Sequence, residues 1–451
     1  MPLRGDRARL SRLELARTDM KIDGPDSSGL GAWGLSVSTR SAPRSSRPPG
    51  GCARVAIANA QGRVVNWDDP IIDAAATDTG MRRSNNQDSY TIVRASSPEV
   101  WRQRGHLYMV ADGMGAHAVG ELASKMACDN IPHNYNKTRN GSPADAISKA
   151  YQTVSALIHG RAALNRDFQG MGTTSSTLIL LPEGALIAHV GDSRVYRVRG
   201  TRIDQLSFDH SLVWELVRRN HLTPDQALKA VPKNVITRSL GPDPVVEVDV
   251  EGPLPVETGD TFVLCSDGLS GPVTDPEIGT FAAHFHPEHA CRYLVQLANL
   301  RGGLDNITVV ILHVGPWVEP QSGKAEGEPP AQQPALGTPK RGRGLRLGNL
   351  FSSRNRRNVQ TVVADTPYRT AECPINEALI ANLTELVRNA QAMAIEGSWP
   401  LDWAILANFR REGEEARAAG DLRATLRCLG EAIVLLGLAG RIHRKSNGQS
   451  H

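Results

Sequence analysis

The feature that most constrains this 451-residue sequence is a set of short apolar runs that each meet an aspartate at a turn. Apolar runs of this length, bounded by Gly and other turn residues, favour buried β-strands. A fold built on them brings several carboxylates to the ends of its strands. The runs are residues 106–111 before Asp112, 185–190 before Asp192, 261–266 before Asp267, and 307–312 after Asp305.

One Asp-Gly pair after a strand is an ordinary turn, but the repetition has a chemical consequence. Carboxylates that converge repel one another unless they are protonated or neutralised by cations. A site made only of oxygen ligands favours hard divalent ions such as Mg²⁺ or Mn²⁺. Two such ions can activate a water at neutral pH, which suits phosphoryl hydrolysis. Arg83, in the same domain, offers a forked cation for a phosphate group.

Helical patterns alternate with the apolar runs. Apolar residues at helical spacing predict helices around 119–127 and 147–158, and Ser142 before Pro143 is a typical helix start. Further helices are expected over 211–230, from Asp275 onward, and over 287–299. The main domain therefore mixes strands and helices.

Composition excludes several classes of protein. The 51 basic and 47 acidic residues give a net charge of +4, so we do not expect nucleic acid as a partner of the whole chain. Every apolar run is interrupted well before the ~18 residues that a membrane-spanning helix needs. Six cysteines without a C-x-x-C pair, and no secretory signal, predict a cytoplasmic protein.

Changes in composition divide the chain into four parts. Residues 1–70 are expected to be a mostly disordered extension, and 72–316 the main domain. Residues 317–373 read as a linker, rich in Pro and Gly and then basic, which is either solvated or in contact with an acidic surface, a membrane or nucleic acid. Residues 374–442 are helical in pattern, either one tetratricopeptide-like hairpin or a small bundle or dimerisation module, with a protein partner that the sequence does not identify.

Seven motifs in order resemble those of metal-dependent protein serine/threonine phosphatases of the 2C type, and the bacterial branch matches best. The resemblance spans about residues 73–314. The motifs are Gly80-x-x-Arg83-x-x-Asn86-Gln87-Asp88, Asp112-Gly-Met-Gly-Ala-His117 with Gly120-Glu121, Gly172-Thr173-Thr174, Gly191-Asp-Ser-Arg194, Asp209-His-Ser211, Ser266-Asp-Gly268 and Asp305-Asn-Ile-Thr308.

The resemblance implies an α+β fold, a four-layer α/β/β/α sandwich of two antiparallel sheets flanked by helices, to which the C-terminal all-α segment is added. It also implies two Mg²⁺ or Mn²⁺ ions and a weaker third one. Asp112 would bridge the two ions. Asp267 and Asp305 would complete the protein ligands of the first ion. The Gly113 carbonyl would bind the second ion, and Asp88 would act on that ion through water. Asp192 would hold the third ion with Asp267, and Arg83 would bind the substrate phosphate. No covalent phospho-enzyme is expected, and residues 206–245 would form a flap that influences substrate choice.

Three positions depart from the family pattern. Gln87 stands where many members have a Glu ligand, and Ala116 replaces a Gly before His117. Met114 occupies the position of a histidine that protonates the leaving group in animal relatives, so the general acid is unassigned. His117 is either that acid or a structural residue at a helix start, and His189 reads as a packed strand residue.

The resulting hypothesis is a cytoplasmic phosphatase that removes phosphate from phosphoserine and phosphothreonine in proteins and opposes a bacterial Ser/Thr kinase. One alternative is a catalytically silent phosphoprotein-binding or scaffold protein, in which Gln87 and Ala116 have spoiled the centre. Another is a hydrolase of small phosphorylated metabolites.

Overall fold

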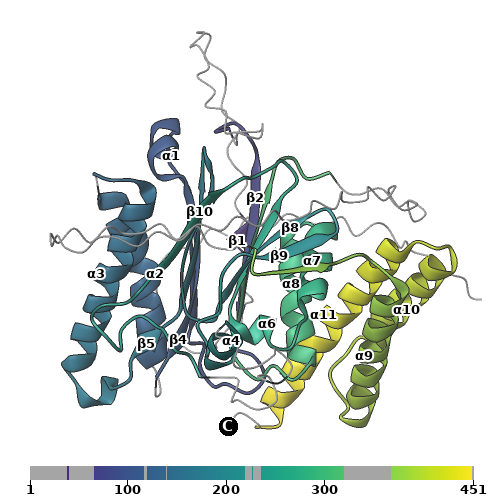
Figure 1. Cartoon of the computed structure of the whole chain (residues 1–451). Helices are drawn as coiled ribbons and strands as arrows, with labels where there is room; N and C mark the ends of the chain where they lie inside the picture. The colour runs from purple at the N-terminus through teal and green to yellow at the C-terminus, as the bar shows by residue number, and fades with distance from the viewer. Residues whose placement is uncertain are drawn as a thin grey trace, which may run out of the picture. The chain divides into compact units, whose positions relative to one another are not determined.

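The structure of the protein, a computed structural model, describes residues 38–39, 66–115, 119–138, 140–218, 226, 235–318 and 367–448. Within these ranges the strands form two antiparallel sheets (Figure 1). The first sheet has the order β1 (Ser38–Thr39), β2 (Ile71–Asp78), β12 (Ile307–Val314), β11 (Thr261–Cys265), β8 (Arg194–Arg199), β9 (Arg202–Gln205) and β13 (Arg369–Glu372). The second has the order β10 (Asp249–Leu254), β7 (Gly184–Val190), β6 (Ser175–Leu181), β4 (His106–Met114) and β3 (Asp88–Val93), with β5 (Gly172–Thr173) paired to β4.

Helices cover the outer face of each sheet. The second sheet packs against α2 (Val119–Lys137) and α3 (Pro143–Ala163), and the first against α7 (Asp275–His284) and α8 (Pro287–Leu300). The short elements are α1 (Pro98–Arg104), the 3-10 helix η1 (Arg166–Phe168), α4 (Leu212–Arg218) and α6 (Asp267–Ser270). The α+β sandwich of two antiparallel sheets flanked by helices, expected from the sequence, is confirmed.

The central strands β6, β7, β11 and β12 are apolar on both faces because both of their faces are buried. In β12, Val309 and Ile311 face the helices, whereas Val310 and Leu312 pack between the two sheets. This period of two is the ordinary geometry of a strand. A continuous apolar run is therefore what a central strand of this sandwich requires.

Helix starts follow the capping rules. The Ser142 hydroxyl accepts a hydrogen bond from the Asp145 amide at 3.1 Å, and the Asp145 carboxylate accepts one from the Ser142 amide at 3.2 Å. Pro143 occupies the first turn. This capping box confirms the predicted start of α3.

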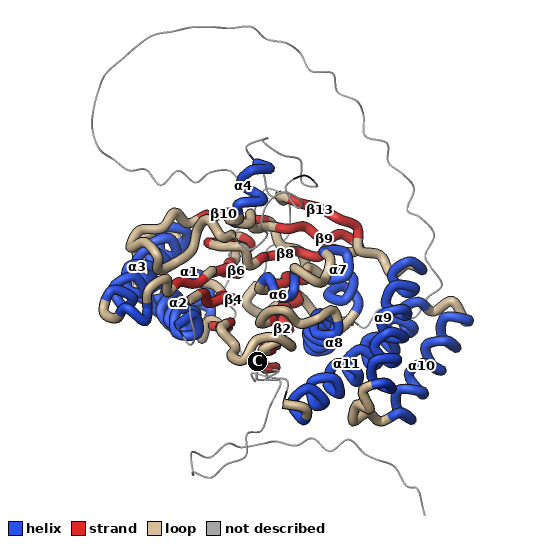
Figure 2. The backbone as a smooth tube through the Cα atoms, turned by 90° about the horizontal axis from the view of Figure 1, so that it is seen from below, coloured by secondary structure: helices blue, strands red, loops and turns tan. Residues whose placement is uncertain are grey.

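Three C-terminal helices follow the sandwich; the last of them lies beside α8, and the other two pack against that last helix (Figures 1 and 2). They are α9 (Glu377–Glu396), α10 (Trp403–Ala418) and α11 (Leu422–Ser446). Gly420, with φ +78°, ends the turn after α10, and the Asp421 carboxylate caps α11 by accepting from the Ala424 amide at 2.9 Å. Apolar side chains of α9 and α11 share one buried cluster with α8.

Several predicted boundaries differ from the observed ones. Asp112 lies within β4 rather than in a turn after it, and Asp267 begins α6. The end of the expected linker forms β13, which pairs with β9, and Ser38–Thr39, in the expected N-terminal extension, pairs with β2. Residues 1–37 and 40–65 of that extension, the basic segment at 340–357, and most of the helical pattern after Arg218 lie outside the described residues.

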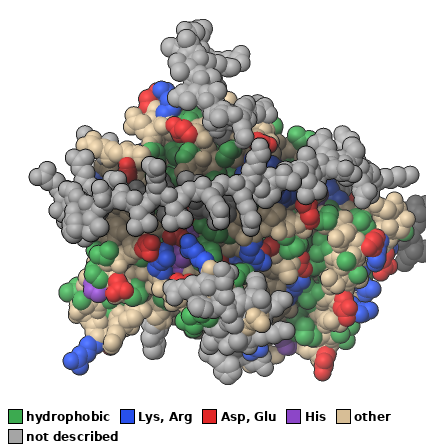
Figure 3. Space-filling view, viewed as in Figure 1, with side chains coloured by type: hydrophobic (Ala, Val, Ile, Leu, Met, Phe, Trp, Pro, Cys, Tyr) green, Lys and Arg blue, Asp and Glu red, His purple; other side chains and the backbone are tan. Residues whose placement is uncertain are grey.

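None of the helices in the described ranges combines the length and the apolar character needed to cross a bilayer. On the face seen in Figure 3, basic and acidic side chains are interspersed rather than separated by sign wherever the surface is not covered by grey atoms. On that face, basic and acidic side chains are therefore mixed at short range, in keeping with the near balance of charge in the whole sequence.

Candidate active site

Two of the predicted aspartates face each other on neighbouring strands. Asp88, the first residue of β3, pairs in register with Asp112 of β4. The Asp112 amide donates to the Thr174 hydroxyl at 2.9 Å, and its carbonyl accepts from the Thr174 amide at 2.8 Å. The Thr173 hydroxyl also donates to that carbonyl at 2.8 Å. The backbone at Asp112 is therefore fixed from both sides.

Asp88 is buried and is held by Ser266, which lies between β11 and α6. The Ser266 hydroxyl donates to Asp88 Oδ2 at 2.7 Å, and the Asp88 amide donates to Asn86 Oδ1 at 3.1 Å. Burial, together with the charges of Asp267 and Asp305, raises the pKa of Asp88 to about 7, against hydrogen bonds from Ser266 and Thr308 that lower it. The rise has the sign expected for a carboxyl group among like charges.

The same repulsion reaches the other carboxylates. Burial and then the charge of Asp267 raise the pKa of Asp192 to about 8. Burial, followed by the charges of Asp88, Asp267 and Asp192, raises the pKa of Asp112 well above its ordinary range. Burial and Asp305 likewise raise the pKa of Asp267. Five aspartates that are far apart in sequence therefore share one electrostatic environment.

Several carboxylate oxygens in this group have no hydrogen-bond partner. One oxygen each of Asp88, Asp192 and Asp267 is buried without a partner. A buried charged oxygen without a donor is costly, and a hard divalent cation is the partner that such oxygens prefer. Within the described ranges, no three His, Cys, Asp or Glu side chains are already arranged as a metal-holding cluster. The fit to a cation therefore rests on the unpaired oxygens and the shared negative charge.

Arg83 lies beside these carboxylates. Its Nη2 donates to Asp305 Oδ2 at 2.8 Å, while 49% of its side chain stays exposed. The loop before it runs close to Asp305, since a Cβ on Gly80 would stand 2.1 Å from the Asp305 carbonyl oxygen. Gly80 also has φ +79°, a conformation that favours glycine. The structure thus brings Arg83 to the rim of the group of carboxylates.

Asn306 joins the Arg83 loop to the carboxylates, a role that the sequence did not reveal. Its Oδ1 accepts from the Gln87 amide at 2.7 Å, and its Nδ2 donates to the carbonyls of Thr79 and Asn85 at 2.9 Å each. Its own amide donates to Asp305 Oδ1 at 2.8 Å. The signal available was its place directly after Asp305, but its partners lie more than 200 residues away.

Gly113 is placed by close backbone contacts. Its amide donates to the Gln87 carbonyl at 3.1 Å, and a Cβ at this position would stand 2.0 Å from the Gly120 carbonyl oxygen. Gln87, which departs from the family pattern, donates through Nε2 to the Gly115 carbonyl at 3.4 Å. Ala116 and His117 lie outside the described residues, and Met114 ends β4.

His189 is buried in β7, as its apolar neighbours predicted. Its Nδ1 lies 2.9 Å from the Ser176 hydroxyl, and its Nε2 lies 2.9 Å from the Gly191 carbonyl. Burial lowers its pKa to about 3, so the ring is neutral near neutral pH. Arg194 is also internal, because it pairs with Asp209 through Nη2 at 2.7 Å. We therefore assign neither His189 nor Arg194 a role in substrate binding.

The expected flap over 206–245 is described only at its two ends. At its base, the Leu212 amide donates to the Val235 carbonyl at 2.9 Å, and the Thr237 amide donates to the His210 carbonyl at 2.8 Å. The two described ends are therefore held together across residues 219–234, of which only Gln226 lies within the described ranges.

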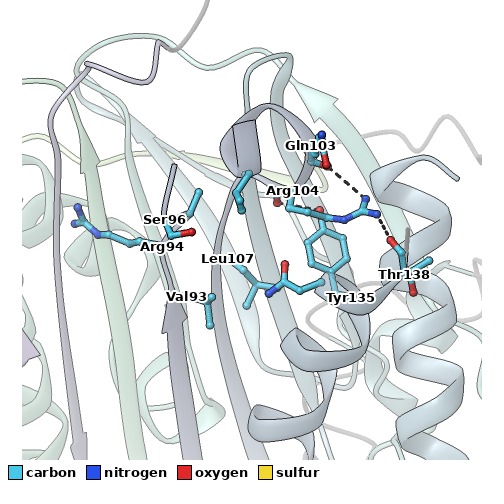
Figure 4. A pocket seen from close by; sticks show the side chains of 12 residues that line it. Val93, Arg94, Ser96, Gln103, Arg104, Leu107, Tyr135 and Thr138 are labelled. Atoms are coloured by element: carbon cyan, nitrogen blue, oxygen red, sulfur yellow. Dashed lines mark hydrogen bonds between the residues drawn. The ribbon is translucent and has the colours of Figure 1, made fainter. Parts of the chain in front are cut away.

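A cavity of about 590 Å³ lies away from the carboxylates, between α1, the β3–β4 edge and the end of α2 (Figure 4). Its two lining arginines are already engaged. Arg94 pairs with Asp73 at 2.7 Å, and Arg104 stacks over the Tyr135 ring and donates to the Thr138 carbonyl. The cavity therefore offers no unpaired arginine to a ligand.

Comparisons with known proteins place these observations in a family context. A model of the protein phosphatase 2C family matches residues 81–299. A putative protein phosphatase 2C-type from Streptococcus pyogenes is 36% identical over 242 residues, which are 52% of this chain and 95% of that protein. Protein phosphatase PhpP of Streptococcus pneumoniae is 34% identical over 242 residues, 52% of this chain and 94% of that protein. The solved S. agalactiae serine/threonine phosphatase superposes with a TM-score of 0.50 at 35% identity, over 54% of this chain and 99% of its own.

Proposed function

Because the chain belongs to the protein phosphatase 2C family, which is metal-dependent, we propose that it hydrolyses phosphoserine and phosphothreonine in proteins. The observation that carries this proposal is the group of buried carboxylates with unpaired oxygens beside the half-exposed Arg83. Its relatives are named as protein phosphatases, which supports proteins rather than small metabolites as substrates.

The proposed ligands of one ion are the carboxylate oxygens of Asp112, Asp267 and Asp305. The proposed ligands of a second ion are Asp112 and the Gly113 carbonyl, and Asp88 is proposed to act on it through water. Asp192 and Asp267 are proposed to hold a weaker third ion. Mg²⁺ or Mn²⁺ suits this all-oxygen set. Bound there, such ions would supply Lewis-acid activation of a water and neutralise the carboxylates.

Arg83 is proposed to bind the substrate phosphate. A guanidinium carries five N–H donors, so its hydrogen bond to Asp305 leaves others for phosphate oxygens. Its position at the edge of the carboxylates allows it to hold a phosphate group next to them. Asp305 in turn orients the guanidinium, and Asn306 fixes the backbone around both residues.

The setting is proposed to be the bacterial cytoplasm, where a Ser/Thr kinase would add the phosphate that this enzyme removes. The five described cysteines are free and buried, which suits a reducing compartment. We propose residues 72–316 as the phosphatase domain and 374–442 as a helical module with a protein partner of its own.

The test is turnover by the purified full-length chain with Mn²⁺, on a phosphothreonine peptide and on a panel of sugar phosphates. The proposal predicts release of phosphate from the peptide, little release from the sugar phosphates, and loss of activity in Asp267→Asn. Asp129→Asn, which changes an exposed aspartate on α2, serves as the matched control and should keep full activity. A wild-type chain that binds the peptide but never cleaves it would instead support a silent phosphoprotein-binding protein.

A further inference from the structure

The C-terminal helix α11 reaches the loop that carries Arg83. The Arg441 guanidinium pairs with the Asp78 carboxylate at the end of β2. One turn further along, Arg444 Nη1 donates to the Met81 carbonyl at 3.0 Å. The end of α11 is thereby joined to the chain just before Arg83, at Asp78 and Met81.

The same loop is held on its other side by the connection between α8 and β12. The amides of Met81 and Arg82 both donate to the Gly303 carbonyl, at 2.7 and 3.1 Å. The Gly80 amide donates to Asp78 Oδ1 at 2.8 Å. The backbone before Arg83 therefore lies between the Gly303 turn and the end of α11.

In the ion pair between Arg441 and Asp78, the aspartate is the buried partner. The Asp78 side chain has no exposed surface, and its Oδ1 also accepts from Asn299 Nδ2 at 3.3 Å. A buried carboxylate that loses its cation is strongly destabilising. The contact thus ties the position of α11 to the end of β2.

Small residues let α11 approach α8 closely. A Cβ on Gly430 would stand 3.0 Å from the Tyr293 ring, and a Cβ on Gly437 would stand 2.4 Å from Gln296 Oε1. The Tyr293 hydroxyl donates to Glu431 Oε1 at 2.6 Å. In Figure 1 the yellow helix α11 runs beside α8 toward the lower part of the sheets. The helix is therefore seated along its length and not only at its end.

This contact is an addition to the family pattern. The family model ends at residue 299, and the 242 matched residues already account for 95% of the S. pyogenes relative. The three C-terminal helices begin at Glu377, beyond that model. What α11 does at the Arg83 loop is therefore a property of this chain and not of the matched relatives.

We propose that Arg441 and Arg444 are positioning residues for Arg83, so that the seating of the C-terminal helices sets the affinity of the site for phosphorylated substrates. The inference rests on the proposed function, because it concerns the same phosphate site. Its physical basis is that a side chain can bind phosphate tightly only when its backbone is already held in the bound position. A partner that displaced α11 would then weaken substrate binding.

The test compares Arg444→Ala with wild type in the full-length chain, using a phosphothreonine peptide at saturating Mn²⁺. We expect KM to rise by about 3- to 20-fold with kcat unchanged, the size of effect usual for positioning side chains. Arg417→Ala, which breaks an exposed ion pair with Glu377 between α9 and α10, is the matched control and should leave KM unchanged. Arg441→Lys, which keeps the charge beside Asp78, should fold normally and raise KM less than Arg444→Ala.

A double-mutant cycle separates positioning from general damage to the fold. In an Arg83→Ala background, Arg444→Ala should raise KM no further, because the residue that it positions is gone. An equal rise of KM in both backgrounds, or no rise in either, would overturn the inference.

Binding of inorganic phosphate, measured by titration calorimetry, gives a readout that does not need turnover. Weaker phosphate binding in Arg444→Ala than in wild type supports the inference even if the peptide is not a substrate. A wild-type chain that binds phosphate but cleaves no peptide would contradict the proposed function alone. Equal phosphate affinity in the two proteins would overturn the inference alone.

Discussion

The chemistry at the level of single residues is governed by the mutual repulsion of buried carboxylates. Burial and neighbouring charge raise the pKa of Asp88 to about 7 and that of Asp192 to about 8, from an ordinary value of 3.8. In the unfolded chain both groups lose their protons near that ordinary value. The folded protein therefore binds more protons than the unfolded chain between these limits, and its stability without metal falls as the pH rises through this window.

A divalent cation should oppose this dependence, because the stability that it adds grows with pH. Because metal binding requires the ionised carboxylates, we expect the rise in melting temperature caused by Mg²⁺, relative to EDTA, to grow as the pH increases from about 6 to about 8. Thermal melts in paired buffers measure this difference, in which the contributions of buried histidines cancel. A stabilisation by Mg²⁺ that is constant or shrinks over that range would contradict the assignment of these carboxylates to a metal centre.

Asn306 provides a second test on a single side chain. Asn306→Ala removes the partners of the Gln87 amide and of the Thr79 and Asn85 carbonyls, so we expect a loss of about 2–4 kcal/mol in the free energy of unfolding. Turnover should fall even at temperatures where the variant is fully folded, since the loop that carries Arg83 loses its support. Chemical denaturation and steady-state kinetics measure the two effects. Full activity in a folded variant would show that Asn306 does not organise the site.

The sequence indicates the carboxylates, but it does not indicate the residues that hold them in place by hydrogen bonds. The reason is physical. An aspartate next to an apolar run is visible locally, because the alternation of strand and turn marks it. Asn306, Ser266 and Thr174 act through hydrogen bonds to atoms far away in sequence. No periodicity or composition signals such contacts, so only the folded chain reveals them.

At the level of elements, the site depends on how closely a short helix approaches a strand. Asp267 begins α6, and a Cβ on the next residue, Gly268, would stand 1.9 Å from the backbone carbonyl of Asn306. Neither backbone segment can yield easily. The position of Asp267 is therefore coupled to the strand end that carries Asp305.

Gly268→Ala should consequently push α6 away from β12. We expect a loss of about 2 kcal/mol or more in the free energy of unfolding, together with weaker metal binding. Gly160→Ala, in α3, is the matched control, because no atom lies within 4 Å of the added Cβ and alanine favours helices. Denaturant melts should show the first variant destabilised and the second slightly stabilised. Equal stability of both would show that the close approach at Gly268 is not a constraint.

The sequence predicted the central strands better than the peripheral ones. The runs that became β4, β7, β11 and β12 are long and apolar because both of their faces are buried. In β2, residues 74–76 are alanines, which carry little strand signal. The strand β13 has mostly exposed residues and follows a stretch of linker composition, so only its pairing with β9 reveals it.

At the level of the whole molecule, the C-terminal helices share a core with the sandwich rather than standing apart from it. Side chains from α8, α9 and α11 belong to one buried cluster. That cluster includes Tyr293, Leu294, Leu383, Ile433 and Leu436. Each large apolar side chain in such a cluster contributes about 1.5–3 kcal/mol. The sequence pattern predicted these helices but could not show which surface they cover.

A chain ending at Pro316 tests this shared core. Its loss of β13 and of the three helices exposes the outer face of α8, so we expect the melting temperature to fall by about 10 °C or more, with aggregation. Differential scanning fluorimetry and light scattering follow both effects, with the full-length chain as reference. A truncated chain as stable and soluble as the full one would mean that the helices add nothing to the sandwich.

Calorimetric titration of the full-length chain with Mn²⁺ measures whether these buried carboxylates hold divalent cations. We expect saturable binding by the wild type and at least about 10-fold weaker binding by Asp267→Asn, since a proposed metal ligand is removed. Asp129→Asn should bind like the wild type. Absence of binding by the wild type, or equal affinity in wild type and Asp267→Asn, would contradict the proposed metal centre.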